Sequence, residues 1–127
     1  MPVNERQVGG DHYKKAEYQH WDWAVDNFGP EYLAAAVTKY VVRWRTKDGL
    51  KDLRKAQHYL EKLLEKHAQE AYPYPPPRLA LEIDRLTVVY ALTAKELSIC
   101  SAMATYRRRE DLETALTLLK ELIEEGL

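Results

Sequence analysis

The sequence predicts an all-α protein, and three observations support this class. Apolar residues recur three and four residues apart along most of the chain, which is the repeat of a helix that buries one face. Helix start and stop signals flank these stretches, including Gly29-Pro30, Gly49 and Gly126. Strand signals are absent throughout. We therefore expect an antiparallel helical hairpin with an N-terminal Gly-rich loop, a Pro-rich hinge and a C-terminal three-helix segment.

The chain opens with a short polar tail that leads into VGGDHYKK, Val8 to Lys15. Paired glycines lose much backbone freedom on ordering, so they favour a turn with positive φ or a close approach of the backbone to a ligand. A polar turn at the end of a flexible tail is the alternative. The next stretch, HWDWAVDNFG, predicts a short helix that Asp22 caps and Gly29 ends.

Two long helices are expected next. The first starts at Gly29-Pro30-Glu31, where proline suits the first helical turn, and helical spacing continues to Asp48-Gly49. The second starts at once, and its apolar stripe consists of Leu53, Ala56, Leu60, Leu63 and Leu64. Two long helices joined by so short a turn predict an antiparallel hairpin.

The stretch AYPYPPP, Ala71 to Pro77, cannot continue a helix, because proline lacks the backbone donor. A stiff spacer is expected there, and a proline-rich ligand for a partner's aromatic groove is the alternative. This spacer divides the chain into a loop-plus-hairpin unit (1–70), a linker (71–77) and a C-terminal helical segment (78–127).

Three helices are predicted after the linker. Leu79, Ile83, Leu86 and Tyr90 mark the first of them, and Thr93 to Glu96 has the form of a capping box that opens the second. In that second helix the residues expected to face inward are Leu97, Cys100 and Ala104. The last helix has a regular apolar stripe of Leu112, Ala115, Leu116, Leu119, Leu122 and Ile123. Leu118 widens this stripe, which predicts a surface for self-association into a homo-oligomer.

Composition restricts the class of protein. The chain has 127 residues, 46% of them hydrophobic and 31% charged, as in an ordinary globular domain. A net charge of -1 argues against a globally basic protein that binds long nucleic acids. No stretch approaches the ~20 apolar residues of a membrane span, and the single cysteine, Cys100, cannot form an internal disulfide. We expect a cytoplasmic protein with no membrane partner.

The polar side of the hairpin is the strongest candidate for a binding site. Lys39, Arg43 and Lys47 recur at four-residue spacing, and Lys55 lies on the following helix. From position 39 to position 67 there are nine Lys or Arg residues against four Asp or Glu residues. Such a surface attracts anions. The alternative is a solvated face stabilised by pairs one turn apart, with Asp48 and Asp52 at the turn.

The glycine loop adds the parts that a nucleotide site needs. These are backbone donors at Gly9 and Gly10, the ring of Tyr13, and the ammonium groups of Lys14 and Lys15. The chain has no G-x-x-x-x-G-K-[ST] run, which excludes a phosphate cradle of the Walker type.

Catalytic residues stay unassigned. Asp11 and His12 could form an acid–base pair, or Asp11 could hold Mg²⁺, but no motif fixes either role. No metal site is expected, because the candidate ligands lack paired spacing on one helix; they are His12, His20, Asp22, His58 and His67. The three tryptophans are expected in the core or at its rim; they are Trp21, Trp23 and Trp44.

Half of the chain resembles a known family. VGGDHYKK, HWDWAVDNFG and AVTKYVVRWRTKDGLKDLRKAQHYLEKLLE together resemble the SaV-like family of small phage proteins, a domain of unknown function. Some members of that family are described as nucleotide kinases of phages. The resemblance covers about residues 8–65, and it rests on the GGDHY loop combined with the pattern KY-x-x-R…K-x-G-L-x-D-L-x-K-A-x-x-Y-L. It implies binding of nucleotides or nucleotide-like signals inside an infected bacterium.

The leading functional hypothesis is a phage accessory protein that binds nucleotides and sequesters a host signal, such as a cyclic nucleotide used in immunity. The first alternative is a nucleoside-phosphate kinase that acts on deoxynucleotides and requires Mg²⁺. The second is a helical module that inhibits a host protein by binding it. The predicted ligand-binding residues are Gly9, Gly10, Asp11, His12, Tyr13, Lys14, Lys39, Tyr40, Arg43, Lys47 and Lys55.

Overall fold

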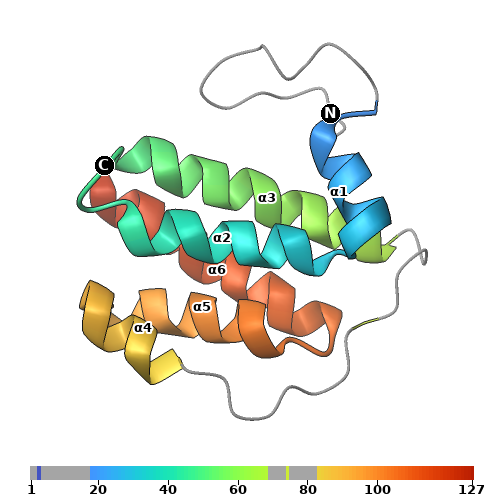
Figure 1. Cartoon of the computed structure of the whole chain (residues 1–127). Helices are drawn as coiled ribbons and strands as arrows, with labels where there is room; N and C mark the ends of the chain where they lie inside the picture. The colour runs from blue at the N-terminus through green and yellow to red at the C-terminus, as the bar shows by residue number, and fades with distance from the viewer. Residues whose placement is uncertain (1–2, 4–17, 69–73, 75–82) are drawn as a thin grey trace.

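The computed structural model describes Val3, residues 18–68, Tyr74 and residues 83–127. Within these parts the chain forms α-helices and no strand, which confirms the all-α prediction (Figure 1). The helices are α1 (His20–Phe28), α2 (Glu31–Arg43), α3 (Leu50–Ala68), α4 (Ile83–Tyr90), α5 (Ala94–Thr105) and α6 (Arg109–Gly126). The glycine loop, and the proline-rich stretch apart from Tyr74, lie outside the described residues.

Helix α1 begins two residues before the predicted cap. Gln19 is the N-cap residue, and Asp22 lies at the third helical position, where its carboxylate accepts a hydrogen bond of 2.9 Å from the Gln19 backbone N–H. The prediction that Asp22 is itself the cap was therefore wrong, because an acid three residues into a helix can satisfy the same exposed donors by reaching back. Gly29 ends the helix with a φ of 89°, a value that favours glycine.

Helices α2 and α3 lie side by side and run in opposite directions, as the sequence predicts (Figure 1). Helix α2 ends at Arg43, before the predicted end at Asp48-Gly49, and residues 44–49 form a tight turn. Gly49 has a φ of 61° and donates a 2.8 Å hydrogen bond to the Trp44 carbonyl, so it closes the turn and does not extend the helix.

Helix α5 opens with the predicted capping box: the Thr93 hydroxyl accepts from the Glu96 N–H, and the Glu96 carboxylate accepts from the Thr93 N–H. Its buried residues are Glu96, Ile99, Cys100 and Met103, whereas the predicted Leu97 and Ala104 are only half-buried. Helix α5 packs against α2 on one side and α6 on the other. The buried residues of α5 therefore face both α2 and α6. The pattern of apolar residues along α5 alone does not show where these two neighbours lie.

Helix α6 packs behind the hairpin and buries the predicted stripe (Figure 1). Leu112, Ala115, Leu119 and Leu122 are buried, and Leu116 and Ile123 pack against them half-buried. The core is continuous from Leu33 and Leu60 of the hairpin to Ile99 of α5 and Leu119 of α6. Residues from both sides of the proline-rich stretch thus form one hydrophobic core.

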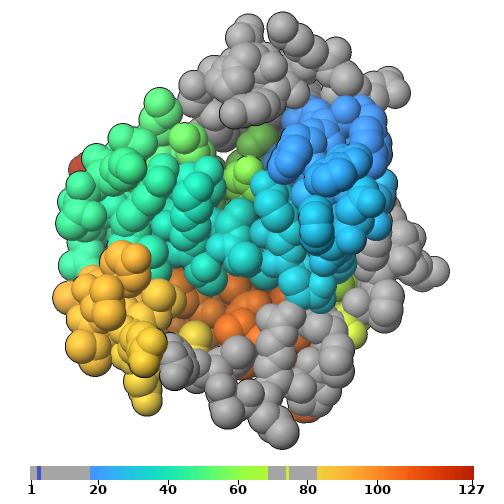
Figure 2. Space-filling model, viewed as in Figure 1, coloured from blue at the N-terminus to red at the C-terminus, as the bar shows by residue number. Residues whose placement is uncertain are grey.

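Helix α4 differs from the other helices, because it has eight residues and none of them is buried. Figure 2 shows α4 at one margin of the molecule, next to the end of the hairpin. Val88 is 81% exposed and Val89 66% exposed. The Ala91 residue that follows has a φ of 51° and accepts a 2.8 Å hydrogen bond from Arg45, so the turn after α4 is tied to the hairpin turn.

Candidate functional site

Four of the predicted site residues meet on the hairpin around the ring of Tyr40. The Arg43 guanidinium carbon lies 4.9 Å from the centre of this ring, the Lys39 ammonium 5.4 Å and the Lys55 ammonium 5.6 Å. These are contact distances for cations on an aromatic ring. We call Lys39, Tyr40, Arg43 and Lys55 the Tyr40 cluster.

The cluster follows from helix geometry. Arg43 follows Lys39 by four residues and Tyr40 by three, so on α2 its side chain is a neighbour of both. Lys55 comes from α3, which the hairpin turn brings alongside. The predicted Lys47 lies in the turn, where it is exposed, and no contact with the Tyr40 ring is seen.

Arg43 is held in place by a carboxylate. Its Nε and Nη2 atoms donate hydrogen bonds of 3.2 and 3.0 Å to one oxygen of Asp52, whose side chain is fully buried. The other Asp52 oxygen accepts a 3.0 Å hydrogen bond from the Asp48 N–H. The hydrogen bond to Asp52 raises the pKa of Arg43. This pair ties the end of α2 to the start of α3, so Arg43 positions the hairpin as well as adding charge.

The two lysines of the cluster differ from Arg43 in this respect. Within the described part of the chain, neither the Lys39 nor the Lys55 ammonium has a carboxylate within ion-pair distance. Lys39 is exposed and Lys55 is half-buried. Among the residues that the structure describes, two cations without a carboxylate partner therefore flank one phenol ring, which gives the site a local excess of positive charge.

Aromatic rings continue from the cluster toward α1. The Tyr59 ring of α3 lies 5.8 Å from Tyr40, and Trp21 of α1 meets Tyr59 edge-on at 5.5 Å. Trp21 is buried as predicted, with 7% of its surface exposed. The Lys62 ammonium lies 5.2 Å from the Trp21 ring and 3.0 Å from an Asp22 oxygen.

Asp22 fixes α1 to the end of the hairpin. Its Oδ1 atom lies 3.0 Å from the ammonium groups of both Lys62 and Lys66. Asp22 and Lys62 are almost fully buried, so each charge needs the other to offset the cost of its removal from water. The functional consequence is positional, because the pair holds the aromatic residues of α1 beside those of α2 and α3.

The remaining predicted site residues lie outside the described residues. They are Gly9, Gly10, Asp11, His12, Tyr13 and Lys14. The described residues on either side of this segment are both anchored: His58 Nε2 donates a 3.0 Å hydrogen bond to the Val3 carbonyl, and the Tyr18 hydroxyl donates one of 2.7 Å to Asp26. His58 also meets Trp21 edge-on at 4.9 Å. The positions of the glycine-loop residues relative to the Tyr40 cluster stay a prediction.

The histidines are distributed over different environments. His67 is buried, and its Nε2 lies 3.1 Å from the Tyr106 hydroxyl. The Tyr74 ring stacks on the His67 ring: the ring centres are 4.3 Å apart and the planes are nearly parallel. His20 is exposed on α1. Across the described residues, no three His, Cys, Asp or Glu side chains are placed to hold a metal ion.

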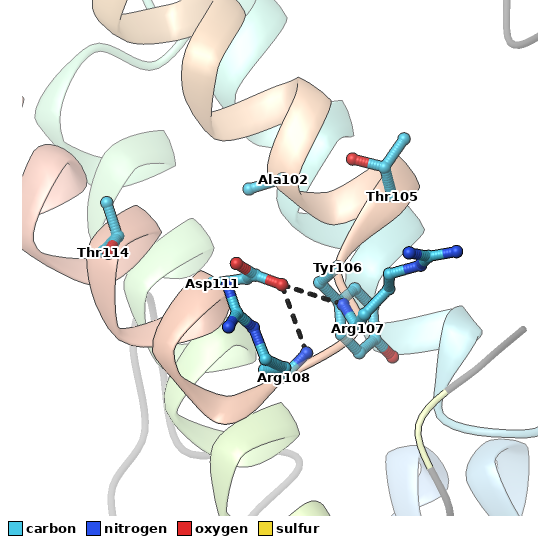
Figure 3. A pocket seen from close by; sticks show the side chains of 7 residues that line it. All are labelled: Ala102, Thr105, Tyr106, Arg107, Arg108, Asp111 and Thr114. Carbon is cyan, nitrogen blue, oxygen red and sulfur yellow. Dashed lines mark hydrogen bonds between the residues drawn. The ribbon is translucent and has the colours of Figure 1, made fainter. Parts of the chain in front are cut away.

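Two cavities lie away from the Tyr40 cluster. The larger, of about 680 Å³, is at the corner between α5 and α6 (Figure 3), and its lining residues are Ala102, Thr105, Tyr106, Arg107, Arg108, Asp111 and Thr114. The Asp111 carboxylate turns back there to accept hydrogen bonds from two backbone N–H groups, while the Arg107 guanidinium points away from it. The second cavity, of about 400 Å³, lies between α3 and α6. Neither includes a predicted site residue.

Comparison with known proteins relates part of the chain to a family. Residues 8–61 match a family model described as a protein of unknown function, DUF3310. The match begins in the glycine loop, includes the Tyr40 cluster and ends within α3, so it stops short of α4, α5 and α6. It is found in the segment for which a family resemblance is predicted, and it attaches no activity to that segment. No curated protein and no solved structure matches the chain.

None of the described helices is both long enough and apolar enough to cross a membrane. Cys100 is fully buried, and burial raises the pKa of its thiol to about 12. This agrees with its expected role as a small apolar filler of the core.

Proposed function

We propose that this chain binds phosphorylated nucleotides at the Tyr40 cluster. The observation that supports this most directly is the presence of Lys39 and Lys55, two ammonium groups without a carboxylate partner in the described residues, beside one aromatic ring. A phosphate accepts charge-assisted hydrogen bonds from such ammonium groups. Arg43 is held beside them by its ion pair with Asp52, which compensates its charge.

The biological role that we propose is capture. Binding requires only fit and charge, so the site needs no catalytic residue to sequester a nucleotide. The resemblance to small phage proteins makes an infected bacterium the proposed setting and a host nucleotide signal, linear or cyclic, the proposed ligand. Gly9, Gly10, His12 and Tyr13 are proposed to complete the site by contributing amides and side chains.

The experiment compares two lysines by isothermal titration calorimetry. The probes are dTMP, dAMP, dGMP and cyclic di-AMP, each titrated into the full chain. Lys55→Ala is expected to weaken binding of the tightest probe by about 1–2 kcal/mol, because a partly buried ammonium loses a charge-assisted hydrogen bond. Lys120→Ala, an exposed lysine of α6, is the matched control and should change binding by less than about 0.5 kcal/mol.

Two results would contradict the proposal. One is the absence of heat and of any thermal shift with every probe. The other is equal weakening by Lys55→Ala and Lys120→Ala, which would indicate loss of general charge and not of a site. A binding constant that falls with added salt in the wild type, and falls less in Lys55→Ala, would support the assignment.

A nucleoside-phosphate kinase is the alternative that involves chemistry. In that reaction a deoxynucleoside monophosphate oxygen attacks the γ-phosphorus of ATP, ADP leaves, and Mg²⁺ neutralises the transferred group. Incubation with ATP, Mg²⁺ and a panel of deoxynucleoside monophosphates separates the two proposals. Formation of deoxynucleoside diphosphates supports the kinase, whereas recovery of intact ligand after heat denaturation supports capture.

A further inference from the structure

Beyond the Tyr40 cluster, aromatic rings form a connected row that continues to the end of α1. Successive ring centres are 5.8 Å apart from Tyr40 to Tyr59 and 6.4 Å from Tyr59 to Tyr32. The row continues from Tyr32 to His20 at 5.9 Å, from His20 to Trp23 at 5.9 Å and from Trp23 to Phe28 at 5.7 Å. We call these residues the aromatic row; they are Tyr40, Tyr59, Tyr32, His20, Trp23 and Phe28.

The outer half of the row is open to solvent. Phe28 is 69% exposed and Trp23 is 47% exposed, although both are large apolar side chains. His20 is exposed as well, and Tyr32 is half-buried. The expectation that all three tryptophans lie in the core or at its rim therefore does not explain Trp23. These rings meet tilted or edge-on, so each exposed ring offers its own face on which a flat ligand can stack.

Charge is distributed unequally along the row. The Tyr40 end carries the three cations Lys39, Arg43 and Lys55. The α1 end carries no lysine or arginine between His20 and Phe28, and Asp26 there accepts a hydrogen bond from Tyr18. A ligand that matches both ends places a phosphate at the Tyr40 cluster and extends several aromatic rings toward α1. A mononucleotide, with one base, would use only part of this surface.

We infer that the aromatic row and the Tyr40 cluster together bind a ligand with two or more nucleobases joined by phosphodiester bonds. This inference rests on the proposed function and specifies its ligand class. The phosphate lies at the Tyr40 cluster, and a second or third base stacks along the row toward Trp23. Stacking on aromatic side chains tolerates any base, so the affinity depends more on ligand length than on base identity. A short linear oligonucleotide and a cyclic dinucleotide share this chemistry.

The test measures how affinity depends on ligand length. The probes are dTMP, 5′-phosphorylated d(TT), 5′-phosphorylated d(TTTT) and cyclic di-AMP, each titrated into the full chain by calorimetry. We expect d(TTTT) or cyclic di-AMP to bind at least tenfold more tightly than dTMP. Trp23→Ala should remove most of that gain, weakening the longer ligand about tenfold while changing dTMP less than twofold, because a stacking contact of this size serves only the additional base.

A matched control guards against a general effect of removing an exposed ring. Tyr90 of α4 is 45% exposed, similar to Trp23, and lies outside the row. Tyr90→Ala should leave all affinities unchanged. Phe28→Ala provides a second, exposed position in the row, so loss of folding in one variant does not decide the test, and a thermal melt of each variant verifies folding.

The outcomes separate the inference from the function on which it rests. If dTMP and d(TTTT) bind with equal affinity, the proposed function stands and the inference is overturned. If no probe binds, both fail. If Trp23→Ala abolishes self-association of the chain, measured by light scattering, and leaves the affinity for every probe unchanged, the row is a protein interface and the inference is overturned. A preference for cyclic di-AMP over d(TTTT) identifies the cyclic form, and the reverse identifies the linear one.

Discussion

At the scale of single residues, Arg43 illustrates how a charge can serve structure and binding together. Its spacing from Lys39 predicts a basic surface, and the structure places it on the Tyr40 ring. The same guanidinium also holds the buried Asp52 carboxylate, which spacing on one helix does not reveal because the two residues lie on different helices. The alternative interpretation of the sequence, a turn stabilised by Asp48 and Asp52, is supported for Asp52, which accepts the Asp48 N–H.

Removing Asp52 should destabilise the fold strongly. Asp52→Ala is expected to lower the free energy of unfolding by about 2–4 kcal/mol, because it leaves the Arg43 guanidinium without its buried partner and the Asp48 N–H without its acceptor. Asp48→Ala is the control: its carboxylate lies 3.8 Å from Arg43 and is 45% exposed, so about 0.5 kcal/mol or less is expected. Urea denaturation of both variants measures the difference, and equal effects would contradict the structural role of Asp52.

The proximity of the hairpin residues could be predicted from the sequence where neighbours on one helix or across the hairpin turn decide the geometry, whereas their role in binding stays a prediction. Lys39, Tyr40 and Arg43 fall within one turn of α2, and the hairpin brings in Lys55. The exposure of Trp23 was not predicted. Trp21 and Trp23 lie on the same short helix, and the sequence contains no signal that one is buried and the other exposed. The i,i+3 spacing of Trp23 from His20 is the only local sign of the aromatic row.

At the scale of helices, the ends are set by polar contacts that the apolar pattern does not contain. The stripes of α3 and α6 were predictable because each helix buries one broad face. The end of α2 could not be predicted from its apolar residues, because Gly49 closes a turn that begins at Trp44. The buried face of α5 differs from the predicted one because two different helices cover it.

Helix α6 offers a test of stability against pH. The Asp111 carboxylate accepts hydrogen bonds of 2.9 Å from the Arg107 N–H and 3.1 Å from the Arg108 N–H, and these bonds lower the pKa of Asp111. Because the folded pKa lies below the unfolded one, the stabilisation is complete above about pH 4 and is lost as the pH falls through the folded value. Asp111→Ala is expected to cost about 0.5–2 kcal/mol at pH 7.

The measurement is the unfolding free energy of wild type and Asp111→Ala at pH 7, 5 and 2.5. The difference should shrink as the pH falls through the folded pKa of Asp111, because protonation of the wild-type carboxyl removes the charge that accepts the two hydrogen bonds. Asp84→Ala, in the first turn of α4, is a control for the loss of an acid near a helix start. A difference that stays constant with pH would show that Asp111 acts through packing and not through its charge.

At the scale of the whole molecule, one core joins the hairpin to α5 and α6, while α4 has no buried residue and contributes the partly buried Leu86 to the edge of that core. Self-association was predicted from the apolar width of the last helix, but Leu118 is half-buried and packs against the core. The large exposed apolar side chains of the C-terminal helices lie on α4 instead, at Val88, Val89 and Tyr90. We therefore propose α4 as the surface through which two copies associate.

This proposal predicts that the wild-type chain forms dimers or larger oligomers, and that Val88→Lys combined with Val89→Lys yields monomers. The physical reason is that two lysines cannot be buried in an apolar contact without a counter-charge. Light scattering after size-exclusion chromatography, over a range of concentrations, measures the mass. The control is Lys120→Ala on α6. A wild-type chain that is monomeric at every concentration, or a double variant that still oligomerises, would contradict it.

One further consequence follows from the buried Glu96 carboxylate. It accepts hydrogen bonds of 2.6 Å from the Trp44 indole and 2.8 Å from Arg45, and also accepts from the Thr93 N–H. Trp44 and Arg45 belong to the hairpin turn, whereas Thr93 belongs to the start of α5. The contacts of Glu96 with Trp44 and Arg45 therefore form only when the two halves of the chain meet. The Trp44 indole N–H is thus a natural reporter, because its proton exchange should accelerate when the halves separate.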